Sequence, residues 1–322
     1  MAAEDVDPNE PLPFEGVLGV PEVDAFPGTG IALRHCRVQI PAQSGFRGLN
    51  LQQTDGIILA LDWVTADFHH VWGSAVMVAP GVAITARHTI DAMRDAGFLA
   101  EAGGILLAYG FHSQGMMIWN VVHMDQDPSG DLAILTLVRA TGTPKWPLDA
   151  PLPVNAASIA ARMPQKGEVL TLIGFRAEKP FFTSTGVDTR IDVGLYGSVG
   201  PVLDLYERRR DSMMPKPSAY IDAATLGGMS GGAAFDANGQ LIGIISKGMS
   251  TDDDNGPSFI LLTWPILFTE FEVVWPRGLS GSPTSIHAMA CAGLASIEGI
   301  ENLIPGGDAN GTLTVTMIIP PG

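Results

Sequence analysis

Short apolar runs separated by Gly, Pro or Asp dominate the chain between residues 56 and 138, and no long amphipathic helix interrupts them. Six of these runs are expected to be strands: Gly56–Val64, Gly73–Val78, Val82–Thr85, Ile105–Tyr109, Met116–His123 and Leu132–Val138. Six short strands in succession are typical of a closed antiparallel barrel.

A second series of strand-like runs follows a Pro- and Ala-containing stretch, Thr141–Val154, that we interpret as a linker. Its members are Glu168–Gly174, Gly186–Tyr196, Ser218–Ala223, Ala233–Phe235, Leu241–Ser246 and Phe259–Thr263. Asp236-Ala-Asn-Gly239 is a turn signal of the Asn-Gly type. The pattern predicts an all-β protein with two packed antiparallel six-stranded β-barrels, at about 54–140 and about 155–276, within one domain of residues 54–276.

Different patterns flank this domain on both sides. Residues 1–53 form a Pro-rich, irregular N-terminal arm with one candidate strand, Ala32–Ile40. In the C-terminal extension, 277–322, Ser282-Pro283 predicts an N-cap with Pro at the first helical position. Apolar residues then recur at helical spacing up to Leu303, and Thr312–Ile319 alternates like a strand. The extension is shorter than an independent domain, so we expect it to pack on the second barrel.

Three motifs carry the candidate chemistry, in the chain order His, Asp, Ser. They are Thr85-Ala86-Arg87-His88, Ser129-Gly130-Asp131 and Gly228-Met229-Ser230-Gly231-Gly232. A serine hydroxyl is a poor nucleophile unless a base takes its proton, and an imidazole can accept and return one near neutral pH. We therefore expect His88 to be the base, Asp131 to orient it, and Ser230 to be the nucleophile.

The stretch from about Gly56 to about Phe271 resembles the trypsin-like serine peptidases, which have this triad order. Gly73–His88 is similar to the family's strand-turn segment that ends in the catalytic histidine. Asp222–Gly232 is similar to the serine motif of the Do-like (HtrA-type) bacterial branch, with equal spacing to the serine. The resemblance implies a trypsin-like fold and a serine endopeptidase that acts through an acyl-enzyme. The C-terminal extension is too short to be the peptide-binding domain of many Do-like enzymes.

The resemblance also implies the remaining site residues. Gly228 and Ser230 would form the oxyanion hole with their backbone N–H groups. The base of the primary specificity pocket would lie near Ala224 and Thr225, and its wall would be the strand with Ser246, Lys247 and Gly248. This apolar base predicts small or medium apolar P1 residues, whereas Lys247 pointing into the pocket would favour acidic ones.

Two residues depart from the family pattern. Arg87 stands where a small residue usually precedes the histidine, so the rim of the site is expected to be reshaped. Met229 stands where activated trypsins have an Asp that pairs with a new N-terminus, so no such activation is expected. The alternative function is a catalytically silent trypsin-like module that binds a protein partner. The complete triad favours the enzyme.

Composition limits the other partners. The formal net charge of −16 makes nucleic acid an unexpected partner. Apolar runs fall short of the ~18 residues of a membrane span, so no membrane is expected. An acidic N-terminus unlike a signal peptide, with only Cys36 and Cys291, predicts a cytoplasmic protein. A protease there needs restraint, which suggests a dedicated protein or peptide substrate or a regulatory protein partner.

The weaker motifs are interpreted without a cofactor or a metal. His69-His70 is expected to be a loop pair, Asp252–Gly256 a hairpin tip rather than a calcium loop, and Arg208–Arg210 an exposed loop. Gly228–Gly232 also fits the nucleophile elbow of α/β-hydrolases. That fold needs an Asp and then a His after the serine, and the only later histidine is His287, in the predicted tail helix.

Overall fold

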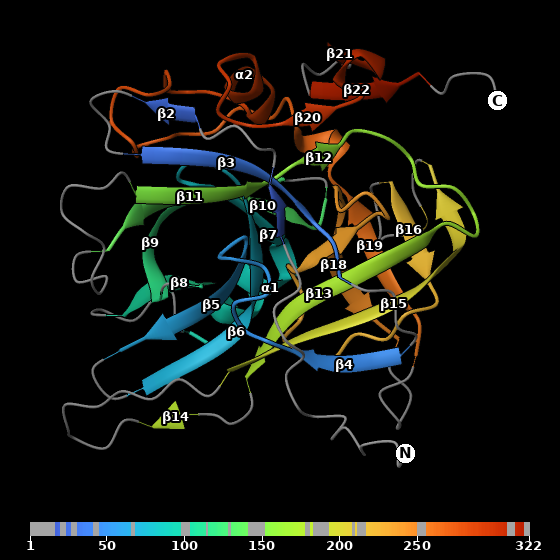
Figure 1. Cartoon of the computed structure of the whole chain (residues 1–322), viewed down its shortest axis with the longest axis horizontal. Helices are drawn as coiled ribbons and strands as arrows, with labels where there is room; N and C mark the ends of the chain where they lie inside the picture. Colours follow the sequence, from blue (N-terminus) through green and yellow to red (C-terminus); the bar gives the residue numbers. More distant parts are fainter. Residues whose placement is uncertain are drawn as a thin grey trace, which may run out of the picture.

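The first barrel is closed by six antiparallel strands in the order β6-β5-β8-β9-β10-β7, with β6 also pairing β7 (Figure 1). This computed structural model describes residues 17–19, 24–26, 31–40, 45–65, 68–97, 104–113, 115–127, 130–140, 152–177, 181–182, 193–207, 210, 217–249, 256–307 and 313–318. The barrel strands are β5 (Ile58–Val64), β6 (Phe68–Ala79), β7 (Val82–Ala86), β8 (Ile105–His112), β9 (Gly115–Gln126) and β10 (Leu132–Arg139). All six predicted strands are confirmed. A short seventh strand, β14 (Phe181–Phe182), pairs with the start of β6.

The second barrel closes in the same way, in the order β17-β13-β15-β16-β19-β18, with β17 also pairing β18. Its strands are β13 (Val169–Ala177), β15 (Val193–Tyr206), β16 (Ser218–Ile221), β17 (Ala233–Phe235), β18 (Leu241–Gly248) and β19 (Ser258–Leu262). The predicted end of β15 at Tyr196 is wrong, because the strand continues through Gly200 and Pro201. Gly200 is needed there because a Cβ would lie 1.8 Å from the carbonyl oxygen of Asp222.

The N-terminal arm joins the linker between the barrels. The arm strand β3 (Ile31–Val38), predicted from the sequence, pairs in parallel with β11 (Leu152–Ala157). The other arm strands are β1 (Val17–Gly19) and β2 (Asp24–Phe26), which pair β3, and β4 (Gly45–Leu49), which pairs β15. The linker is thus not irregular at its end: β11 and the next strand, β12 (Ile159–Ala160), were not predicted.

The C-terminal extension contains a shorter helix than predicted. Its elements, preceded by the 3-10 turn η2 (Trp264–Ile266), are α2 (Ile286–Cys291), β20 (Ile297–Glu298), η3 (Ile300–Asn302), β21 (Leu303–Gly307) and β22 (Leu313–Met317). The N-cap of α2 is Ser285, whose hydroxyl accepts the Ala288 N–H, and not Ser282, which bonds the Glu272 carboxylate. Gly293, at φ +74°, follows the helix and ends it. The predicted strand is confirmed as β22, which forms a hairpin with β21.

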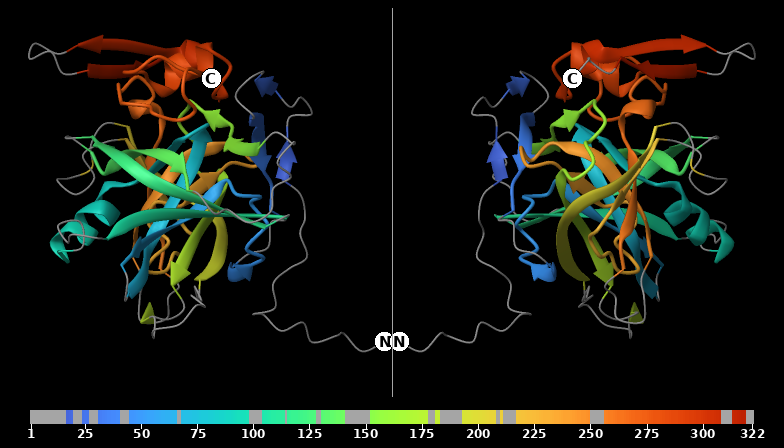
Figure 2. Two further views of the ribbon diagram at one scale, coloured as in Figure 1. Left: turned by 90° about the vertical axis from the view of Figure 1, so that its left-hand side faces the viewer. Right: turned by 90° about the vertical axis from the view of Figure 1, so that its right-hand side faces the viewer.

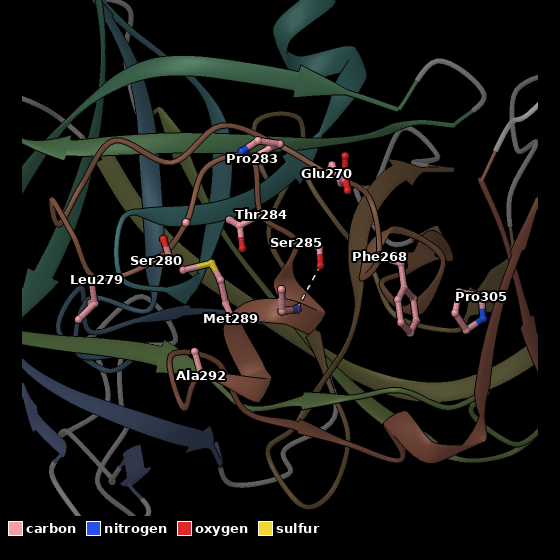
Figure 3. Close-up of a pocket in the computed structure, with 12 residues that line it drawn as sticks. Phe268, Glu270, Leu279, Ser280, Pro283, Thr284, Ser285, Met289, Ala292 and Pro305 are labelled. Carbon is pink, nitrogen blue, oxygen red and sulfur yellow. Dashed lines mark hydrogen bonds between the residues drawn. The ribbon is translucent and has the colours of Figure 1, made fainter.

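The extension contacts both barrels, more than the expected packing on the second alone (Figure 2). Its strand β20 pairs with β12 and so joins the second sheet. Its helix α2 also contacts β6 of the first barrel. The segment just before the extension contacts the first barrel as well: the Thr136 hydroxyl in β10 donates to the carbonyl oxygen of Glu272 (2.5 Å), and the Trp119 ring in β9 meets Trp275 edge to face at 5.1 Å. An open cavity of about 590 Å³ lies between Phe268 and Pro305, over α2 (Figure 3).

One helix of the first barrel was not predicted. It is α1 (Arg87–Asp95), which follows β7 directly and buries Thr89, Ile90 and Met93. Ala86 at its N-cap position has no side chain that can cap it. The cap comes from the Asp131 carboxylate, which accepts the His88 N–H at 2.8 Å from 43 residues away in the chain. No helix in the described ranges is long and apolar enough to cross a membrane.

Candidate active site

His88 and Asp131 meet where two neighbouring strands of the first barrel end. His88 follows β7 in the first turn of α1, and Asp131 precedes β10, which pairs with β7 so that Leu132 faces Ala86. His88 Nδ1 lies 2.8 Å from Asp131 Oδ2 and 3.0 Å from Oδ1. The His88 side chain is 45% exposed and the Asp131 side chain 16%. The imidazole is therefore held on its Nδ1 side and open to solvent.

The Asp131 carboxylate has further donors from both barrels. Oδ1 also accepts the backbone N–H of His88, at the N-terminus of α1, where the helix dipole favours a negative charge. Oδ2 accepts the hydroxyl of Ser246, in β18 of the second barrel, at 2.5 Å. Both oxygens are thus oriented by fixed donors, and Asp131 is tied to the opposite wall of the cleft.

Ser230 lies on the turn between β16 and β17 and reaches the same place. Its hydroxyl donates to the carbonyl oxygen of Ser246 at 3.2 Å. Ser246 therefore contacts both partners, with its side chain on Asp131 and its carbonyl on Ser230. Among these described residues, no hydrogen bond joins Ser230 Oγ to His88; the serine hydroxyl is turned toward Ser246 instead.

The turn around Ser230 packs tightly against the first barrel. The Ser230 carbonyl accepts the Ser74 N–H at 2.8 Å. Gly231 has φ +84°, and a Cβ there would lie 2.0 Å from the Ser74 oxygen, so only glycine fits. The backbone N–H groups of Gly228 and Ser230 have no acceptor within the part of the chain that the structure describes. They are two adjacent donors beside the hydroxyl.

Met229 is fully buried behind this turn. Its sulfur accepts the Leu226 N–H at 3.4 Å, and its backbone packs against Gly174, where a Cβ would lie 2.8 Å from the Met229 oxygen. The position that could hold an activating carboxylate is filled by an apolar side chain.

The residues predicted for the specificity pocket lie on two segments that nearly touch. A Cβ on Gly248 would lie 2.8 Å from both the carbonyl oxygen and Oγ1 of Thr225. Thr225 is buried, and its hydroxyl shares a 2.8 Å hydrogen bond with Ser258. Ala224 is half-buried, whereas Lys247 is exposed and does not fill this space.

Two serines that hold the backbone of the predicted pocket base were not themselves predicted as site residues. Ser258 Oγ donates to the carbonyl oxygen of Ala223 at 2.7 Å, and Ser198 Oγ to that of Ala224 at 2.5 Å. Ser198 lies in β15 beyond Tyr196, where the strand was predicted to end. Ser258 directly precedes the predicted strand Phe259–Thr263 and is the first residue of β19, and its polar side chain beside an apolar run was the available signal.

A second His–Asp pair occurs in the first barrel. His69 and His70 lie within β6, so their expected place in a loop is wrong. His69 Nδ1 is 3.0 Å from Asp62 Oδ2, and Asp62 is completely buried. Burial raises the pKa of Asp62, although the His69 hydrogen bond and charge oppose the shift. Burial lowers the pKa of His70.

The remaining motifs add no second site. The described residues contain no group of three or more His, Cys, Asp or Glu that could hold a metal ion. Asp252–Asn255 and Arg208-Arg209 lie outside the described residues, while Arg210 is stacked 4.3 Å from the Phe259 ring centroid. His287 stacks on Phe268 in the extension.

Comparison with known proteins gives one family. The model of the trypsin-like peptidase domain matches residues 73–244. No curated protein matches the chain.

Solved structures of low similarity also match. The Rv3671c protease of M. tuberculosis in its inactive form is 17% identical over 65% of this chain and 85% of its own, with a TM-score of 0.40. The HtrA-type protease AlgW with a decapeptide is 19% identical over 65% of this chain and 61% of its own, with a TM-score of 0.43. Deg5 is 17% identical over 65% of this chain and 84% of its own, with a TM-score of 0.41.

Proposed function

This chain belongs to the trypsin-like peptidase domain family, and we propose that it is a serine endopeptidase with His88, Asp131 and Ser230 as its triad. The observation that carries the proposal is the 2.8 Å contact between His88 Nδ1 and Asp131, with the Ser230 hydroxyl on the carbonyl of Ser246 that completes the same cluster. A structural His–Asp pair would not need an exposed imidazole beside a serine on a glycine turn.

In the proposed reaction, Ser230 Oγ leaves the Ser246 carbonyl and attacks the scissile carbonyl carbon. His88 takes the hydroxyl proton on Nε2 and then gives it to the leaving amine, which yields the acyl-enzyme. Asp131 holds the proton on Nδ1 and stabilises the imidazolium. Water then attacks the acyl-enzyme with His88 again as the base. Apo structures commonly have a loose serine–histidine contact that tightens when substrate binds.

The backbone N–H groups of Gly228 and Ser230 are proposed to bind the oxyanion. They are unpartnered donors on a turn whose conformation is fixed by Gly228 at φ +97° and by the contacts of Gly231. Such a donor is worth about 2.7–4 kcal/mol in the transition state. The assignment is supported because both N–H groups lack an acceptor among the described residues, so no rearrangement is needed before they bind the oxyanion.

For the substrate, we propose a protein or peptide with a small P1 residue. A Cβ on Gly248 would lie 2.8 Å from both the carbonyl oxygen and Oγ1 of Thr225, so the two segments proposed as base and wall of the pocket are packed against each other. We propose that this packing keeps the pocket short and favours Ala over Leu and Met at P1. Lys247 is exposed at the rim and contributes no charge to the base. Ala224, Ser246, Lys247 and Gly248 keep their proposed places as pocket residues.

Activation and setting complete the proposal. The buried Met229 supports activity without a newly cut N-terminus. Restraint would then come from a dedicated substrate or a regulatory protein partner. Cys36 and Cys291 are both free, so the fold does not depend on a disulfide, which fits a reducing cytoplasm.

The test is labelling with a fluorophosphonate probe, because only an activated serine reacts. We expect one equivalent of probe on Ser230, located by peptide mass spectrometry. Ser230→Ala should abolish it, and Ser280→Ala, in the extension, should label like the unchanged chain. A folded chain that stays unlabelled at Ser230 would contradict the enzyme and favour the silent binding module.

A further inference from the structure

Arg87, the residue before the proposed base, forms two side-chain hydrogen bonds within the first barrel. Its Nε donates to Asp91 Oδ2 at 3.1 Å, one turn further along α1. Its Nη1 donates to the carbonyl oxygen of Asp127 at 3.1 Å. One guanidinium therefore joins the helix that carries His88 to the segment that leads into Asp131.

The Asp127 carbonyl is a part of the turn that positions Asp131. It also accepts the Gly130 N–H at 3.3 Å, and the Asp127 N–H donates to the Leu132 carbonyl at 3.0 Å. Asp131 lies inside this closed turn. A contact that fixes Asp127 therefore fixes Asp131 as well.

The backbone repeats the connection that the side chain makes. The Arg87 N–H donates to the Asp131 carbonyl at 2.9 Å, and the His88 N–H to the Asp131 carboxylate at 2.8 Å. Without the guanidinium, the backbone would still hold the first residues of α1 to Asp131, but no hydrogen bond among the described residues would join α1 to the Asp127 carbonyl. The helix has no side-chain cap of its own to stiffen that end.

Asp91 connects Arg87 to two further side chains. Its carboxylate accepts Arg94 Nη1 at 2.7 Å and Gln126 Nε2 at 3.3 Å in addition to Arg87. Arg94 lies on the same helix and bonds the same carboxylate, but among the described residues it makes no hydrogen bond to Asp127. Arg94 is thus a matched control, because it shares the charge and the partner but not the bridge.

We infer that Arg87 is a positioning residue that fixes α1 to the Asp127–Leu132 turn, so that the His88 imidazole stays aligned with Asp131 for turnover. This inference rests on the proposed function. A planar guanidinium suits the task because it donates in two directions at once, which an ammonium on a flexible stem does less well.

The kinetic test uses Arg87→Ala, Arg87→Lys and Arg94→Ala with a peptide substrate and the fluorophosphonate probe. Arg87→Ala should lower kcat and the labelling rate by about 100-fold, as for a catalytic group displaced by about 1 Å, with KM unchanged. Arg87→Lys should recover part of the loss, and Arg94→Ala should stay within about twofold. In an Asp131→Asn background, Arg87→Ala should cost little more, because the two residues act through one unit.

A second readout does not depend on activity. The proton on His88 Nδ1, bonded to Asp131, should give a low-field NMR signal that is identified by its loss in His88→Ala. We expect the signal to be lost or broadened in both Arg87 variants, more strongly in Arg87→Ala than in Arg87→Lys. It should be kept in Arg94→Ala. If the unchanged chain is not labelled by the probe, the proposed function fails, while the signal still tests Arg87. Arg87→Ala with unchanged labelling and an unchanged signal would overturn the inference, as would an equal loss in Arg94→Ala.

Discussion

Two of the His–Asp pairs of the first barrel, His88–Asp131 and His69–Asp62, have similar geometry and opposite surroundings. The Nδ1-to-carboxylate distance is 2.8 Å in His88–Asp131 and 3.0 Å in His69–Asp62. The first pair has an exposed imidazole, and its carboxylate bonds Ser246 of the other barrel. The second has a His side chain 11% exposed and a completely buried Asp. The distance between two groups therefore does not identify a catalytic pair; access and a neighbouring nucleophile do.

The largest expected difference is in turnover. Asp131→Asn should lower kcat by about 10⁴, because the asparagine no longer holds the tautomer that leaves His88 Nε2 free to accept a proton. The matched change in the other pair, Asp62→Asn, should leave kcat of the folded protein within a few-fold. Peptide hydrolysis at saturating substrate measures both. A comparable loss in Asp62→Asn, with an unchanged melting temperature, would mean that the two pairs are coupled.

Stability should show the reverse order. His69→Ala removes one of the partners of a buried carboxylate, which keeps its bonds to Tyr109 and the His70 backbone, and should lower the free energy of unfolding by about 2–3 kcal/mol. His88→Ala removes a half-exposed partner and should cost about 1 kcal/mol or less. Urea titration of both variants measures the contrast. Equal losses of unfolding free energy in the two variants would contradict a structural role for the His69–Asp62 pair.

A change in the size of the proposed specificity pocket should have an effect of intermediate size. We expect this effect at the site that contains His88–Asp131, because the His69–Asp62 pair has no proposed pocket. Thr225→Gly removes the side chain that faces Gly248, so P1 preference should move from Ala toward Leu and Met, by roughly 10–200-fold in relative kcat/KM. A peptide library measures the change, and Lys166→Ala, at an exposed lysine, is a control that should leave the profile as it is. A dominant preference for Arg or Lys in the unchanged chain would refute the proposed pocket.

The smallest expected effect is in the pH dependence of stability. Burial raises the pKa of Asp62, so between its unfolded and folded pKa values the folded state binds more protons. The contribution of Asp62 to stability is then largest in acid and falls as pH rises through this window above about 4. Asp62→Asn should remove that slope, measured as urea midpoints across pH.

Asp55 supplies a control of opposite sign. Burial tends to raise its pKa, but the hydrogen bond and charge of His112, with the Ser113 N–H and Arg34, outweigh it and lower the pKa. Its stabilising contribution is therefore present above the unfolded pKa and is lost as pH falls through the folded one. Asp55→Asn should flatten the acid side of the curve. The same slope in both variants would contradict these assignments.

The sequence predicted most barrel strands because each carries its own apolar run and turn signals. It predicted the proposed triad because each residue lies beside a strand end with a specific motif. The missed elements all depend on residues distant in the chain. Helix α1 is capped by Asp131, β11 exists because β3 pairs with it, and β15 continues past Gly200 because Asp222 packs there. The positioning role proposed for Arg87 was missed for the same reason, since its contact with Asp127 defines it.

The parallel pair β3–β11 also has a consequence in time. Residues 31–38 leave the ribosome long before residues 152–157 exist, so at 5–20 residues per second this arm strand waits roughly ten seconds for its partner. During that interval the strands of the first barrel, β5 to β10, are synthesised. Strand β3 has no partner over this time, because β11 follows them in the chain. Ser230 and Ser246 are synthesised later still, and β20, which joins the linker from the other side, comes after them. A nascent chain therefore cannot assemble the His88–Asp131–Ser230 cluster until most of its own length has been translated. Its arm is synthesised well before that cluster can form.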